Sequence, residues 1–173
     1  MKRKLKIAFY SQAGAINIGI ASLIPFLEQE HDCDVFVRIL ENDVKEQIVN
    51  YQPDVVGFNM YTNECSDTIN FMKELRKELD SFFVVGGFHP ISYPSLIDEE
   101  EVVDAICIGE GEHSFYELVQ KISRGEDFYS TKGFYFRTGG KVIKNELNQL
   151  VEDLDSLPFP KRELYYEKYK LLE

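Results

Sequence analysis

The residues best suited to contact a ligand follow the ends of short apolar runs. In "VVGGFHP", two buried-type valines lead into Gly86 and Gly87, and Phe88, His89 and Pro90 come next. Two glycines in a row remove two side chains and let a backbone turn sharply or lie close to another molecule. His89 is a potential metal ligand, a turn residue bonded to the backbone, or a contact for a bound ligand. These three interpretations stay open at this point.

Two acids stand close together in "GEGEHSF", where Glu110 and Glu112 alternate with glycines. Neighbouring acids in a loop rarely divide the general-acid and general-base roles, and acids are also favoured at a helix N-terminus. Contact with ribose or amide groups of a ligand is therefore expected here, and no catalytic residue is predicted.

The spacing of cysteines and histidines does not predict a metal site. Cys33, Cys65 and Cys107 lie far apart, without the close spacing of zinc or iron–sulfur ligands. An odd number of scattered cysteines suits a reducing compartment, so a cytoplasmic location is expected. The three histidines do not cluster by spacing either.

Composition limits the partners. The chain has 173 residues, 44% of them hydrophobic and 28% charged, which is typical of one globular unit with a complete core. Its net charge of -11 makes nucleic acid and anionic membranes poor partners. No apolar run approaches the roughly 20 residues that cross a bilayer, and no signal peptide follows the basic start.

Short apolar runs alternate with amphipathic segments along most of the chain. Strands are predicted over 5–10, 34–40, 55–58, 82–85 and 105–108, and helices over 18–30, 43–51, 66–79, 94–101 and 114–123. This alternation favours an α/β fold with a parallel sheet covered on both faces. We expect a flavodoxin-like, doubly wound sheet of five parallel strands in the order 2-1-3-4-5, within a Rossmann-like three-layer sandwich.

The last quarter of the chain has a different pattern. Residues 133–137 and 141–144 flank Thr138-Gly139-Gly140, which predicts a β-hairpin. Pro158 and Pro160 in "DSLPFP" exclude regular helix there and indicate an extended connector. The expected organisation is an α/β domain at 1–127, a hairpin appendage at 128–150 and a connector at 151–173.

The loops at one edge of this sheet are rich in glycine. In a parallel sheet, ligands bind outside the carboxyl ends of the strands, where the strand order reverses. Six of the 11 glycines fall in the loops at that edge: Gly14, Gly19, Gly86, Gly87, Gly109 and Gly111. Neither a P-loop nor a Gly-x-Gly-x-x-Gly motif occurs, so a P-loop NTPase and a standard dinucleotide fold are not expected.

Five stretches in order resemble a known family: "PDVVGFNMYT", "FFVVGGFHPISYPSL", "VDAICIGEGEHSFYELV", "GFYFRTGGKVIKN" and "DLDSLPFPKREL". Together they resemble the N-terminal cobalamin-binding domain of B12-dependent radical SAM enzymes, which include methyltransferases and Mg-protoporphyrin IX monomethyl ester oxidative cyclases. The resemblance covers nearly the whole chain. It implies a corrinoid on the strand ends, with its nucleotide tail entering the sheet edge.

The resemblance also implies which residues contact the cofactor and how. The expected contacts are Asn17, Gly19, Asn59, Met60, Tyr61, Thr62, Gly86, Gly87, Phe88, His89, Gly109, Glu110 and Gly111. The loop after the first strand has no histidine, unlike the Asp-x-His-x-x-Gly loop of many corrinoid proteins. Base-off cobalamin without a protein histidine on cobalt is therefore expected, and His89 becomes a cofactor contact rather than a metal ligand.

The Cys-x-x-x-Cys-x-x-Cys motif of radical SAM enzymes does not occur in this sequence. The resemblance therefore implies that the partner is a radical SAM domain of the same polypeptide, which would hold S-adenosylmethionine and a 4Fe-4S cluster. On this interpretation the chain binds the cofactor but does not turn over alone. Two alternatives stay open: a domain that has lost cobalamin and serves as a docking or substrate-binding scaffold, and a flavodoxin-like binder of FMN or a nucleotide.

Overall fold

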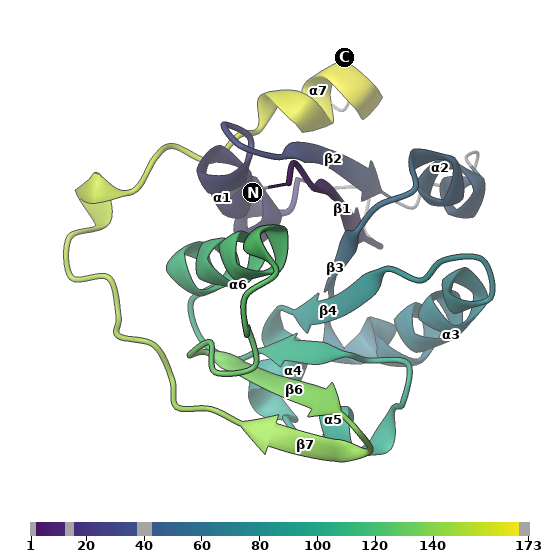
Figure 1. Cartoon of the computed structure of the whole chain (residues 1–173). Helices are drawn as coiled ribbons and strands as arrows, with labels where there is room; N and C mark the ends of the chain where they lie inside the picture. Colours follow the sequence, from purple (N-terminus) through teal and green to yellow (C-terminus); the bar gives the residue numbers. More distant parts are fainter. Residues whose placement is uncertain (1–2, 13–15, 38–42, 170–173) are drawn as a thin grey trace.

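A seven-stranded sheet forms the centre of the computed structural model, which describes residues 3–12, 16–37 and 43–169. Its order is β2-β1-β3-β4-β5-β6-β7 (Figure 1). The strands are β1 (Lys6–Ser11), β2 (Asp32–Val37), β3 (Val55–Asn59), β4 (Phe82–Gly86), β5 (Ala105–Cys107), β6 (Phe134–Thr138) and β7 (Lys141–Lys144). The first five are parallel to one another, in the predicted order 2-1-3-4-5.

The sheet is mixed and larger than the five parallel strands that were expected. The predicted hairpin forms, but it continues the sheet: β6 pairs antiparallel with β5, and Ala105 lies opposite Phe136. Pairing with β6 satisfies the backbone edge that β5 would otherwise expose. The aromatic residues of β6 also join the core, since Phe134 and Phe136 are fully buried.

Helices cover both faces of the sheet and complete the three layers. Helices α1 (Ile18–Leu27) and α6 (Glu112–Arg124) pack on one face, and α2 (Val44–Tyr51), α3 (Cys65–Arg76) and α5 (Leu96–Glu99) on the other (Figure 1). Alternation along each strand supplies both cores. In β1, for example, Phe9 packs with the α1 and α6 layer, and Tyr10 packs with the opposite layer.

Several helix boundaries differ from the prediction. The first helix ends at Leu27 rather than at residue 30, and the third ends at Arg76 and follows a 3-10 turn, η1 (Thr62–Glu64). A short helix, α4 (Phe88–Ser92), was not predicted because Gly87 and Pro90 are typical of a turn. Pro90 lies in the first turn of that helix, where its missing N–H removes no helical hydrogen bond. The end of the strand predicted at 34–40 lies outside the described residues.

After β7 the chain is extended, apart from η2 (Leu154–Ser156), and ends in helix α7 (Glu163–Tyr169), which was not predicted. The Lys161 N–H donates to the Ala21 carbonyl at 2.8 Å, and the Tyr165 side chain is fully buried in the core beside α1. The extended segment therefore returns to the domain and docks on it (Figure 1). Within the described residues, none of the helices is long and apolar enough to cross a membrane.

Candidate functional site

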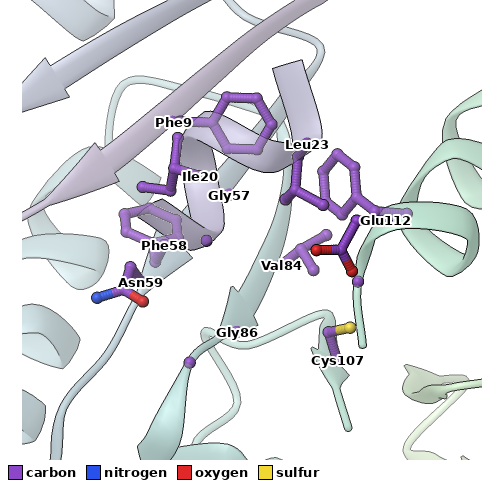
Figure 2. Close-up of a pocket in the computed structure, with 14 residues that line it drawn as sticks. Phe9, Ile20, Leu23, Gly57, Phe58, Asn59, Val84, Gly86, Cys107 and Glu112 are labelled. Atoms are coloured by element: carbon purple, nitrogen blue, oxygen red, sulfur yellow. The ribbon is translucent and has the colours of Figure 1, made fainter. Parts of the chain in front are cut away.

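A cavity of about 140 Å³ opens at the carboxyl ends of the parallel strands, between the sheet and helices α1 and α6 (Figure 2). This is the position where the strand order reverses between β1 and β3, as the sequence predicted for a ligand. The cavity is lined by Phe9, Gly19, Ile20, Leu23, Gly57, Phe58, Asn59, Val84, Gly86, Gly87, Cys107, Gly111, Glu112 and Phe115.

Strand register arranges the floor of the cavity in two rows. At the strand ends, Asn59 lies opposite Gly86, and a Cβ on Gly86 would lie 3.9 Å from that of Cys107. Two residues further into the sheet, Gly57 lies between Phe9 and Val84. The first row forms the mouth of the cavity and the second row forms its deep part.

Gly57 allows an aromatic ring to cover the deep part of the floor. A Cβ at this position would lie 2.9 Å from the Phe9 ring, so only glycine lets that ring lie across β3. The Phe9 ring is in turn 5.5 Å from the Phe115 ring, centroid to centroid. Gly57 was not among the predicted site residues. Its signal was its place inside a strand, where glycine often marks close approach of another group.

The two glycines of "VVGGFHP" have different roles. Gly86 has no positive φ, and an added Cβ would meet only the Cβ of Cys107, in ordinary contact. Gly87 has φ of 98°, and an added Cβ would lie 2.6 Å from Asn59 Oδ1 and 3.0 Å from the Met60 carbonyl oxygen. Gly86 therefore leaves room for a ligand, whereas the packing of the chain itself requires Gly87. A large residue at position 87 would disturb the fold as well as the site.

Five of the predicted contacts line the cavity: Gly19, Asn59, Gly86, Gly87 and Gly111. Two others do not line it and have structural contacts of their own. The Asn17 side chain caps α1 by accepting from the Ile20 N–H at 2.9 Å, and Met60 is fully buried in the core on the other side of the sheet.

Four predicted residues lie in the segments that follow β3 and β4. The rings of Tyr61 and Phe88 stack at 5.9 Å and are 37% and 69% exposed. His89 is buried: its backbone N–H donates to the Met60 carbonyl at 3.0 Å, and its ring Nδ1 lies 3.2 Å from Thr62 Oγ1. His89 thus ties α4 to the loop after β3, and its contact with a cofactor stays a prediction.

The last two predicted residues lie outside the cavity wall. Gly109 is exposed, with φ of 96°, and Glu110 is exposed and accepts from the Val151 N–H at 3.1 Å. The other acid of that motif, Glu112, begins α6 and does line the cavity. Of the six glycines expected at this edge, Gly14 lies outside the described residues.

Polar groups are few in this cavity and lie at its mouth. Burial and, to a smaller extent, the nearby Glu112 carboxylate together raise the pKa of the Cys107 thiol to about 12. The thiol is therefore neutral at physiological pH. Over the described part of the chain, no group of three or more His, Cys, Asp or Glu side chains is placed to hold a metal ion.

Comparison with known families decides which family this fold and cavity represent. The family model described as "B12 binding domain" matches residues 10–119, a stretch that includes every lining residue of the cavity except Phe9. The chain belongs to the B12-binding domain family.

Curated relatives of this B12-binding domain are larger proteins. It is 31% identical over 160 residues to an uncharacterized methyltransferase of Pyrococcus horikoshii, a match over 88% of the chain and 35% of the relative. It is also 31% identical to the anaerobic magnesium-protoporphyrin IX monomethyl ester cyclase of Rubrivivax gelatinosus, over 87% of the chain and 29% of that enzyme. The chain thus spans about a third of the length of the curated relatives it matches.

Solved structures confirm the fold of this B12-binding domain. The cobalamin-dependent S-adenosylmethionine radical enzyme OxsB, with aqua-cobalamin and S-adenosylmethionine bound, matches with a TM-score of 0.78 and 16% identity. That match covers 97% of this chain and 25% of OxsB. The radical S-adenosylmethionine methyltransferase TsrM of Kitasatospora setae matches with a TM-score of 0.73 and 17% identity, over 91% of this chain and 31% of TsrM.

Proposed function

We propose that this domain binds cobalamin in the base-off form and inserts the nucleotide tail into the cavity between the sheet, α1 and α6. The observation that carries the proposal is the open space beside Gly86 at the strand-order reversal. A side chain there would project toward the cavity, and glycine leaves it clear. The match to the B12-binding family supports this choice of ligand.

The size of the cavity fits one part of cobalamin only. Pockets that enclose a whole drug-sized ligand hold about 300–1,000 Å³, whereas this one holds about 140 Å³. It can therefore take one planar ring system and leave the corrin ring outside. Exposed apolar residues within two positions of lining residues in sequence offer a surface to the corrin: Ile18, Tyr61 and Phe88.

The histidines of the chain support a cobalt without a protein histidine ligand. His31 is buried and accepts from the Leu5 N–H, and His113 packs its ring against Phe26 on α1. His89 is buried, and its ring Nδ1 lies 3.2 Å from Thr62 Oγ1. When bound, cobalamin supplies a cobalt centre for methyl transfer or radical chemistry, and the residues of this chain bind and orient the cofactor.

A radical SAM domain of the same polypeptide is the proposed partner. The curated relatives are about three times as long as this chain, and the OxsB and TsrM structures are of S-adenosylmethionine radical enzymes. The segment after β7 exposes several large apolar side chains that a partner domain can cover: Leu147, Leu150, Leu154 and Phe159. S-adenosylmethionine and the 4Fe-4S cluster would belong to that domain, and the whole protein would be cytoplasmic.

The same cavity argues against binding FMN or another nucleotide with its phosphate inside the cavity. Among the described residues that line the cavity, Glu112 is the one carboxylate, and it would face a phosphate placed there. Like charges at short distance in a partly buried site repel each other strongly. The nucleotide tail of cobalamin can keep its phosphate outside, because its base enters first.

Retention of the cofactor tests the proposal. Purified protein is mixed with hydroxocobalamin and desalted, and its absorption spectrum is recorded; FMN is tested in parallel. Retained corrinoid with a base-off spectrum is expected, without retained FMN. Loss of the corrinoid on desalting together with weak affinity in titration, or retention of FMN alone, would overturn the proposal for this domain.

A further inference from the structure

The polar and apolar groups of the cavity are separated by depth. Its deep part is built from the side chains of Phe9, Val84 and Phe115 around the backbone of Gly57. The polar side chains of the wall, those of Asn59, Cys107 and Glu112, belong to the strand ends and the start of α6. Figure 2 shows Asn59 and Glu112 on opposite sides of the cavity.

We propose that this separation selects the base of the cobamide: the cavity accepts a benzimidazole and discriminates against a purine. The inference rests on the proposed function, since it concerns the part of the cofactor that enters the cavity. On this proposal, the side chains of the deep wall decide which corrinoid binds. Val84 lies between Gly57 and β5, so its side chain decides whether this part of the floor is apolar.

The two bases differ at the edge that reaches the deep wall. A base that enters tail-first points its six-membered ring away from the sugar and into the cavity. In dimethylbenzimidazole that edge carries two methyl groups, and their burial against Phe9, Val84 and Phe115 favours binding. In adenine the same edge carries an amino group and a ring nitrogen, which would lose their hydrogen bonds to water.

The described residues provide no side-chain partner for those adenine groups at the deep wall, since its lining side chains there are hydrocarbon. A buried donor or acceptor without a partner weakens binding by roughly tenfold or more. For the same reason, one hydrogen bond that a site provides or lacks produces a large difference in affinity between two similar ligands. Glu112 and Asn59 lie at the mouth, beside the part of the base next to the sugar.

Affinities of three corrinoids for the unmodified domain test the inference. Dissociation constants are measured for cobalamin, for the cobamide with adenine as its base, and for cobinamide, which has no nucleotide. We expect the adenine cobamide to bind at least about tenfold more weakly than cobalamin. Equal affinity for the two, or tighter binding of the adenine form, would overturn the selectivity and leave the proposed function standing. If neither cobamide bound, the proposed function itself would be overturned, and the inference with it.

A variant with a matched control tests the role of the floor. Val84→Thr keeps the shape of the side chain and replaces one methyl group with a hydroxyl that can pair with the adenine edge. Val85→Thr makes the same change one residue later, where the side chain is buried on the other face of the sheet. In Val84→Thr, the ratio of the dissociation constant of the adenine cobamide to that of cobalamin is expected to fall at least threefold. In Val85→Thr, this ratio is expected to stay unchanged. The same ratio in both variants would contradict the role of Val84; if a variant failed to fold, the three-corrinoid comparison would still decide the selectivity.

Discussion

At the scale of single residues, the site depends on two adjacent glycines with different physical roles. Gly86 is needed for the space that it leaves, and Gly87 for a backbone conformation that other residues rarely adopt. The sequence predicted the position of both at the strand-end edge. It could not separate their roles, because the contact of Gly87 with Asn59 and Met60 depends on how β3 and β4 align.

Replacing each glycine by alanine should separate these two roles, because the two variants should differ in their free energy of unfolding. Gly87→Ala is expected to lower the free energy of unfolding by about 1–3 kcal/mol, because φ is 98° and the new Cβ would press on the Met60 backbone. Gly86→Ala is the matched control and should change it by less than about 1 kcal/mol. Urea unfolding of the two variants measures the difference. Equal effects would show that the strain assigned to Gly87 is absent.

The role of Gly57 is one that the sequence alone does not reveal. A glycine within a buried strand can mark a bulge, a close neighbour or nothing functional. The reason for Gly57 is the Phe9 ring that lies across it, and that ring comes from a strand 48 positions earlier in the chain. The sequence predicts that the two strands are neighbours, but it does not predict the contact between the Phe9 ring and Gly57.

At the scale of elements, the alternating pattern correctly predicted the five parallel strands and their order. It did not predict that the hairpin extends the sheet, because a two-stranded hairpin has the same local pattern whether its edge is paired or free. Nor did it predict α4, where glycine and proline favour a turn locally but lie at and just after the helix start. Both differences arise from tertiary contacts.

Helix α7 should contribute strongly to stability although it is short. Tyr165 is fully buried against the layer that contains α1, whereas its neighbour Tyr166 is half-buried. Tyr165→Ala is expected to cost about 3–5 kcal/mol of unfolding free energy. Tyr166→Ala is the control and should cost clearly less. Thermal or chemical unfolding measures both, and equal small losses would mean that α7 does not dock as described.

At the scale of the whole molecule, the buried thiols predict how stability depends on pH. Burial raises the pKa of Cys33 and of Cys107 from 9.0 to about 12. Because the folded state holds these protons more tightly than the unfolded chain, their contribution is complete below pH 9 and is lost as pH rises toward 12.

The free energy of unfolding should therefore fall between pH 8 and pH 10.5, by an order of 1–2 kcal/mol for each thiol. Urea unfolding at the two pH values measures this. The double variant Cys33→Ala, Cys107→Ala should lose less stability over the same interval. It should keep part of the slope, since burial also raises the pKa of Tyr51. An identical loss in both proteins would rule out the thiols as its cause.

The nucleotide tail of cobalamin is proposed to enter the cavity beside Gly86. Titration of cobalamin into Gly86→Leu tests this most directly. Thr138→Leu is the control, because it introduces the same side chain at the end of β6, which lies beside the N-terminal ends of the parallel strands. The dissociation constant of Gly86→Leu should rise at least about tenfold, while both variants keep their cooperative unfolding and Thr138→Leu keeps the affinity of the unmodified domain. Equal affinity in all three proteins would show that the tail does not pass Gly86 and would contradict this mode of binding.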